Sequence, residues 1–221
     1  MPAAPHSALL EDLRERIRRI ERRPPRRAAF EATGLAEVDG LLPGGGFPRG
    51  ALSEIAGEPG SGKTALCLAA MARAMGEAGL AAFVDGRGEL YPPAAAALGV
   101  DLARLLIVRP SPGALREALW AAEALLASGA FEVVAVDVPP PAARRPGEAG
   151  PEAMARRLVA AAEKGGTVGL WLAPPWSGAP AAWRVPAAVR LAVTCPEGRP
   201  VVRREFARSA PGPEREAGRG A

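Results

Sequence analysis

A glycine-rich octapeptide carries the clearest chemical signal in this 221-residue sequence. It matches the pattern G-x-x-x-x-G-K-[ST] and consists of Gly57, Glu58, Pro59, Gly60, Ser61, Gly62, Lys63 and Thr64. Glycines let a backbone curl so that successive N–H groups point at phosphate oxygens. We expect Lys63 to reach the β- and γ-phosphates of ATP and the Thr64 hydroxyl to ligate Mg²⁺. A degenerate glycine-rich turn is the alternative, but an apolar strand before the loop and a helix after it favour phosphate binding.

An aspartate at the end of an apolar segment is the second chemical signal. Residues 133–136 are all Val or Ala, and Asp137 follows them. A carboxylate at the end of a buried strand is suited to hold the Mg²⁺ that accompanies a bound triphosphate. It could instead cap the next turn. Because the phosphate loop lies upstream with a helix between, we favour the metal role.

Strands and helices alternate along the chain and must position both signals. The expected strands are 51–56, 80–84, 105–108, 132–136, 167–173, 188–195 and 200–206. The expected helices are 64–78, 93–98, 113–127 and 152–163. This alternation predicts an α/β fold with a mainly parallel sheet covered by helices on both faces. The last two strands, joined by a Pro-Glu-Gly-Arg turn, predict an antiparallel edge.

The two ends of the chain differ from its centre in charge and composition. Residues 1–30 carry eight arginines against four acids, and residues 7–23 have the spacing of an amphipathic helix. We expect a basic N-terminal arm (1–30), a nucleotide-binding core (31–206) and a disordered tail (207–221). The arm suits a nucleic acid or an acidic partner, and a solvated helix face is an equal alternative.

Composition excludes several classes of protein. One histidine and two cysteines without close spacing do not make a zinc cluster. Charged residues interrupt the apolar segments of the N-terminus, so it does not resemble a signal peptide. No segment approaches the ~20 apolar residues of a membrane span. We expect a cytoplasmic protein.

The order of motifs over residues 31–206 resembles the core of the RecA recombinases. The resemblance rests on Thr33-Gly34-Leu35 and residues 42–50, on Phe83-Val84-Asp85 with Leu90 and Pro92, and on residues 98–101 and 187–191. Within this superfamily, the short length and the Leu-Pro-Gly-Gly-Gly segment resemble the ImuA family of bacterial damage-induced mutagenesis. That resemblance implies a role in the SOS response, translesion synthesis and DNA repair. It also implies RecA or error-prone polymerase subunits as partners, and oligomers formed through the N-terminal helix.

The sequence departs from RecA where RecA hydrolyses ATP. Arg87 stands where RecA places the glutamate that activates water, and an arginine is no general base near neutral pH. Glu89 is the remaining candidate base, although on an extended chain its side chain would start ~7 Å further along. Ala94 replaces the tyrosine that stacks on adenine, and Tyr91 is the nearest aromatic residue.

The sensing residues of RecA are also reduced. Pro175 lies in the region where RecA has a glutamine that senses the γ-phosphate. Of the lysines that RecA sends to a neighbour's nucleotide, one cation survives, at Arg203. We therefore expect weak or absent ATP hydrolysis. A DNA-dependent ATPase is the alternative, and a small-molecule kinase is a more distant one.

Two loops rich in proline and arginine follow the carboxyl ends of strands, at 138–151 and 174–187. In RecA the corresponding loops line the DNA channel. Their candidate contacts with single-stranded DNA or a partner are Arg144, Arg145, Trp176, Trp183 and Arg184. Arginines neutralise phosphates and tryptophans stack on bases, but both are equally at home in a protein interface.

Overall fold

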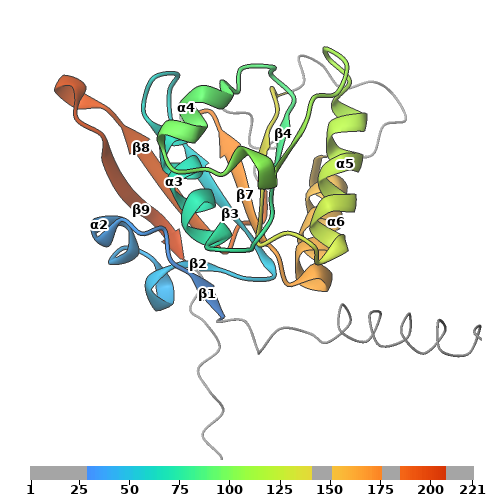
Figure 1. Ribbon diagram of the computed structural model, residues 1–221, viewed down its shortest axis with the longest axis horizontal. Helices are drawn as coiled ribbons and strands as arrows, with labels where there is room; N and C mark the ends of the chain where they lie inside the picture. Colours follow the sequence, from blue (N-terminus) through green and yellow to red (C-terminus); the bar gives the residue numbers. More distant parts are fainter. Residues whose placement is uncertain (1–28, 141–150, 176–184, 208–221) are drawn as a thin grey trace, which may run out of the picture.

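A seven-stranded sheet forms the centre of the molecule, in a computed structural model that describes residues 29–140, 151–175 and 185–207 (Figure 1). The strand order is β5-β4-β6-β7-β3-β8-β9. Neighbouring strands are parallel except β8 and β9, which pair antiparallel at one edge. The strands are β3 (Ala51–Ala56), β4 (Ala81–Asp85), β5 (Leu105–Val108), β6 (Val133–Asp137), β7 (Val168–Ala173), β8 (Val189–Thr194) and β9 (Val201–Ala207). The predicted α/β fold with an antiparallel edge is confirmed.

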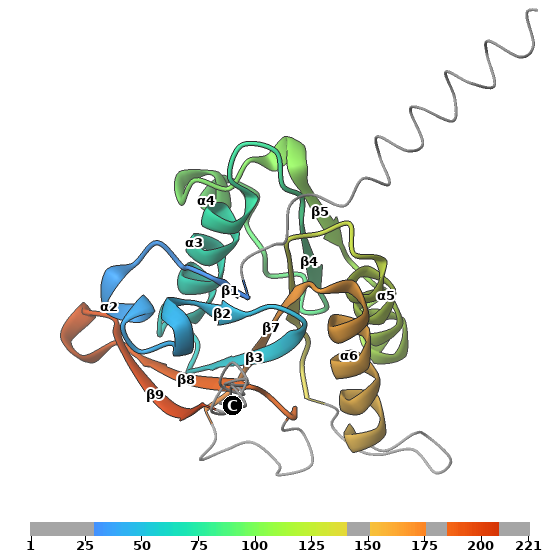
Figure 2. The same cartoon turned by 90° about the horizontal axis from the view of Figure 1, so that it is seen from below.

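Helices cover both faces of the sheet, as Figure 2 shows from below. The helices α3 (Lys63–Met75) and α4 (Pro92–Ala97) pack on one face. The helices α5 (Leu115–Ser128) and α6 (Pro151–Gly165) pack side by side on the other. Successive strand residues alternate between the two apolar layers, so Phe83 faces α3 while Val84 faces α5. Burial on both faces explains why the central strands are apolar at nearly every position.

A small lead-in unit precedes the main sheet and was not foreseen from the sequence. It contains β1 (Phe30–Glu31), β2 (Phe47–Pro48) and the short helix α2 (Ala36–Asp39). Its loop is held by Asp39, whose carboxylate accepts bonds from the Thr33 hydroxyl at 2.7 Å and from the Gly34 amide at 3.2 Å. These hydrogen bonds give Thr33, Gly34 and Asp39 a local structural role, which is to hold the loop together.

Arg49 fastens this unit to the sheet. Its guanidinium pairs with Glu31 of β1 and, at 2.7 Å, with Glu132, which directly precedes β6. The arginine side chain is only 10% exposed. Glu31 and Glu132, which are far apart in the sequence, therefore share one nearly buried cation next to the start of β6.

The helix predicted over 64–78 ends earlier, at Met75. Gly76 leaves the helical conformation, with φ 45° and ψ −138°. The end of the helix leaves backbone carbonyls without helical partners, and Arg104 binds two of them. It donates to Met75 O at 3.1 Å and to Gly76 O at 3.0 Å. A side chain supplied by a distant segment thus caps the helix, and helical periodicity alone could not show this.

Some predicted segments lie outside the described residues. They include the helix at 7–23 and, apart from one or two residues each, the arm at 1–30 and the tail at 207–221. Among the described residues, no helix combines the length and the apolar character needed to cross a membrane.

The two cysteines are expected to react very differently with thiol reagents. Cys67 lies fully buried in α3, where burial raises its pKa far above the usual range, whereas Cys195 is exposed. A raised pKa keeps Cys67 as the unreactive thiol at pH 8. A chromogenic disulfide reagent should therefore titrate one thiol in the native protein and both after denaturation. Two rapidly reacting thiols in native protein would contradict the packing of α3.

Candidate nucleotide-binding site

The phosphate loop connects β3 to α3 and has a backbone that requires its glycines. Gly62, directly before α3, has φ +93°, a conformation that side chains disfavour. A Cβ at Gly57 would lie 2.5 Å from the carbonyl oxygen of Val193 in β8. The loop is therefore curled tightly against the neighbouring strand, with its amides preceding the helix N-terminus.

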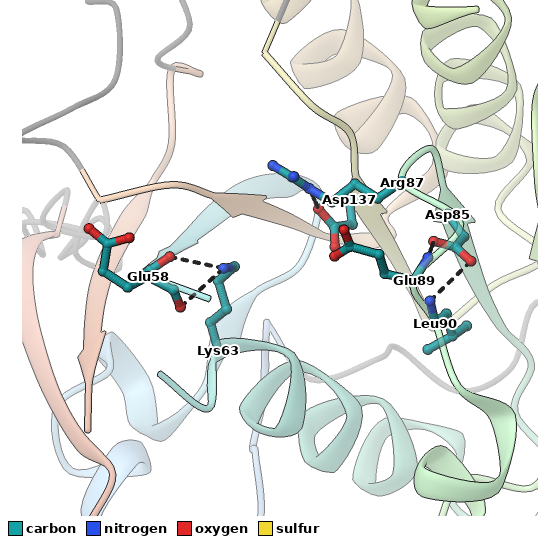
Figure 3. Close-up of polar contacts among 8 residues, drawn as sticks. Glu58, Lys63, Asp85, Arg87, Glu89, Leu90 and Asp137 are labelled. Carbon is teal, nitrogen blue, oxygen red and sulfur yellow. Dashed lines mark hydrogen bonds and ion pairs between the residues drawn. The ribbon is translucent and has the colours of Figure 1, made fainter. Parts of the chain in front are cut away.

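Lys63 points back into this loop. Its Nζ donates to Gly57 O at 2.9 Å and to Glu58 O at 3.4 Å (Figure 3). Burial lowers the pKa of the Lys63 ammonium, and the negative charge of Asp137 opposes that shift. A partly desolvated cation held over the phosphate loop by two backbone carbonyls is suited to bind an anion.

Asp137 ends β6 with its side chain 9% exposed. Arg87 donates from Nε to Asp137 Oδ1 at 2.8 Å. Burial raises the pKa of the Asp137 carboxyl, and the charge and hydrogen bond of Arg87 lower it in part. The ionised acid is therefore only partly compensated by its arginine.

Thr64 and Asp137 are the residues that would hold Mg²⁺, since a hydroxyl and a carboxylate are oxygen ligands that suit this ion. A metal that keeps several waters and phosphate oxygens needs few protein ligands, and a hydroxyl with one carboxylate suffices. Over the described part of the chain, no group of three or more histidine, cysteine or acidic side chains forms a metal cage. When bound there, the metal would neutralise phosphate charge.

The loop after β4 turns sharply and brings Glu89 toward the site. Asp85 accepts hydrogen bonds from the Glu89 amide at 3.0 Å and from the Leu90 amide at 3.2 Å. Figure 3 shows Glu89 directed toward Asp137, and its charge influences both Asp137 and Lys63. The expectation that Glu89 starts further along an extended chain is therefore wrong. The reversal comes from backbone bonds to Asp85, and Gly88 with φ +71° allows it.

Two contacts of the site were missed by sequence reasoning. Arg109, at the end of the edge strand β5, binds Asp85 Oδ2 at 2.9 Å and thereby steadies the turned loop. A Cβ at Gly62 would lie 3.7 Å from Pro200, so the β8–β9 hairpin covers one side of the phosphate loop. The sequence offered one signal for the first contact, because Arg109 directly follows the predicted strand at 105–108.

Two further candidates that the structure describes, Arg203 and Tyr91, are exposed. Arg203 is exposed on β9, opposite Ala192, where a neighbouring molecule could reach it. Tyr91 is 66% exposed. The proposed DNA or partner contacts lie outside the described residues: Arg144, Arg145, Trp176, Trp183 and Arg184.

The site and fold agree with the comparison to known families. The sequence matches the RecA N-terminal domain over residues 16–161, which is more than half of the chain. The chain belongs to the RecA family. Its phosphate loop, its strand-end Asp137 and its turned loop after β4 all fall within the matched RecA segment.

This chain matches only part of the length of each RecA relative. Protein RecA of Salinispora tropica is 40% identical over 121 residues, covering 55% of this chain and 34% of that protein. Protein RecA of Chlorobaculum parvum is 45% identical over 106 residues, or 48% of this chain and 30% of that protein. The chain thus spans about a third of the length of the RecA proteins it matches.

Among solved structures, the RadB recombinase shares the fold. Its TM-score is 0.65 at 21% sequence identity, with 80% of this chain and 90% of that chain covered. This likeness shows the fold, namely the arrangement of the sheet and helices.

Asp137 is expected to reduce the stability of the metal-free protein. Its raised pKa means that the folded state binds the proton more tightly than the unfolded state, so stability falls as pH rises through that window. Asp137→Asn should therefore raise the melting temperature at pH 7.5, measured by circular dichroism in EDTA, and the gain should shrink toward pH 4.

The neighbouring strand-end acid supplies the matched control. Asp85 is fully buried and accepts bonds from two amides and Arg109. Asp85→Asn should lower the melting temperature, because an amide cannot accept all of these bonds. A lower melting temperature for Asp137→Asn as well would show that Arg87 fully compensates Asp137.

Proposed function

We propose that this RecA-family chain binds ATP with Mg²⁺ and hydrolyses it weakly or not at all. The observation that carries the proposal is Arg87, whose Nε lies 2.8 Å from Asp137 Oδ1. The chain keeps elements suited to binding ATP, namely the phosphate loop, Lys63 and Asp137. It has an arginine at the position where RecA has its catalytic glutamate. Binding without efficient turnover is typical of a nucleotide that stabilises an interface.

In the cell, the chain acts as an accessory protein of DNA repair. Support comes from membership in the RecA family and from the resemblance of the segment at 42–46 to the ImuA family. We propose a role in the SOS response and translesion synthesis in the bacterial cytoplasm. Its partners would be RecA or subunits of an error-prone polymerase, with single-stranded DNA as a further ligand of Arg144, Arg145, Trp176, Trp183 and Arg184.

A DNA-dependent ATPase is the second candidate, and the orientation of Glu89 favours it. Glu89 faces Asp137 in Figure 3, and a carboxylate directed into the site is the kind of group that could activate water. Arg87 lies beside the same acid and would attract that carboxylate away from a water molecule. Positioned general bases contribute about 10²–10⁴-fold to rates, so this difference is measurable.

ATP turnover with and without single-stranded DNA separates the two candidates. We expect slow turnover of the wild type that DNA does not stimulate and that Glu89→Gln leaves unchanged, measured by phosphate release. Stimulation by DNA together with loss of turnover in Glu89→Gln would establish the ATPase. Lys63→Ala gives the background of contaminating enzymes.

A further inference from the structure

We propose that Arg87 provides charge that Mg²⁺ otherwise provides, so that this chain binds ATP with little dependence on the metal. The inference rests on the proposed ATP site and concerns how that site balances charge. Its starting point is a permanently charged guanidinium already bound to the acid expected to hold the metal.

The geometry leaves much of Arg87 available to a ligand. Within the described ranges, the hydrogen bond assigned to Arg87 uses Nε, with Asp137 Oδ1 as acceptor at 2.8 Å. The Arg87 side chain is 27% exposed, whereas Asp137 is 9% exposed. The two terminal nitrogens of a guanidinium carry further N–H donors that suit phosphate oxygens.

Arg87 and Lys63 lie on the same side of the site. In Figure 3 the guanidinium extends past Asp137 on the side that faces the Lys63 ammonium. Burial is the main cause of the lowered pKa of Lys63, and the positive charge of Arg87 adds to it. An anion placed between them would be attracted by both cations, and the triphosphate of a nucleotide is such an anion.

The charge balance shows what the arginine changes. The groups that influence one another here are two cations, Lys63 and Arg87, and three acids that are anionic when ionised, Asp137, Glu89 and Glu58. They sum to one negative charge. A glutamate at position 87, as RecA has there, would make the sum more negative by two charges. That difference equals the charge of one Mg²⁺ ion, which such a site would need before it could accept a triphosphate.

A metal at Asp137 must also share the carboxylate with Arg87. Arginine does not lose its proton in proteins, so the guanidinium remains a competitor at every accessible pH. The metal therefore gains less from Asp137 in this chain than from a free carboxylate. Both effects weaken the coupling between metal and nucleotide.

Binding of ATP to the full chain in MgCl₂ and in excess EDTA, measured by isothermal titration calorimetry, tests the proposal. The wild type should lose less than about threefold in affinity when Mg²⁺ is removed, whereas Arg87→Gln should lose about tenfold or more. Arg87→Lys, which keeps a cation, should retain most of the metal-independent binding. Arg157→Gln is the control, because Arg157 pairs with Glu123 on the exposed side of α5 and α6.

The outcomes separate this inference from the ATP site itself. If wild type and Arg87→Gln lose the same affinity in EDTA, the inference is overturned and the ATP site stands. If the wild type binds no more ATP than Lys63→Ala in either buffer, both are overturned.

Asp137→Asn keeps the test decisive should Arg87→Gln unfold. It keeps Arg87 and removes the competing carboxylate. We expect it to bind ATP in EDTA at least as tightly as the wild type. Weaker binding in EDTA would overturn the inference.

Discussion

Lys63→Ala is expected to lower the affinity for ATP by roughly 10- to 100-fold, the usual effect of losing a charged hydrogen bond to phosphate. Lys63 Nζ donates to Gly57 O at 2.9 Å, so the ammonium is held over the loop. Burial lowers the pKa of Lys63, and a nearby phosphate would offset much of the cost of that burial. Titration calorimetry with ATP measures the change.

The chain offers a matched control in its only other lysine. Lys164 lies exposed in the last turn of α6, away from the phosphate loop in sequence and on the other face of the sheet. Lys164→Ala should bind ATP as the wild type does. Both variants should melt within a few degrees of the wild type, since Lys63 makes only two hydrogen bonds to loop carbonyls. Equal affinity of Lys63→Ala and the wild type would exclude nucleotide binding at this loop.

Arg190→Ala is expected to destabilise the fold by about 3 kcal/mol, the largest effect of any exchange considered for this chain. Arg190 of β8 donates from Nε to Glu54 of β3 at 2.8 Å, and the Glu54 side chain is 2% exposed. The same guanidinium donates to Val185 O at 2.8 Å and lies over the Phe206 ring. The exchange removes the Arg190 cation from the buried Glu54 carboxylate. It also removes the group that lies over the Phe206 ring at the β8–β9 edge. Denaturation by urea measures the loss.

A double exchange distinguishes the ion pair from simple packing. Glu54→Gln with Arg190→Leu removes both charges and keeps most of the volume, so it should recover most of the lost stability. If the double variant is as unstable as Arg190→Ala, the loss comes from packing against Phe206 and not from the ion pair with Glu54.

Local patterns in the sequence were sufficient to predict the seven strands of the main sheet and the four longer helices, within a few residues. Strands at 51–56 and 105–108 were predicted with the bounds that the structure has, because short, mostly apolar segments between turn signals indicate strands. The fold class and the parallel sheet followed from the alternation of strands with helices, and the antiparallel edge followed from the Pro-Glu-Gly-Arg turn between the last two strands. The roles of Lys63, Thr64 and Asp137 in holding nucleotide and metal remain predictions.

The contacts that define the chemistry of the site depended on tertiary structure. Arg87 meets Asp137 across 50 residues because β4 and β6 are neighbours in the sheet, and the order of strands is not encoded in their hydrophobic pattern. Glu89 faces the site because its amide binds Asp85, which turns the backbone back on itself. Sequence reasoning treated these residues as an extended chain and therefore missed the turn.

Long-range ion pairs follow the same logic. Arg190 and Glu54 are 136 residues apart, yet they face each other because β8 lies parallel to β3 in one register. A charged residue inside a strand pattern shows only that some partner is needed, since burying an unpaired charge is costly. The sequence therefore determined which residues could bind phosphate and where the strands lie. Strand order and register, set by packing of the whole sheet, decided which charge neutralises which.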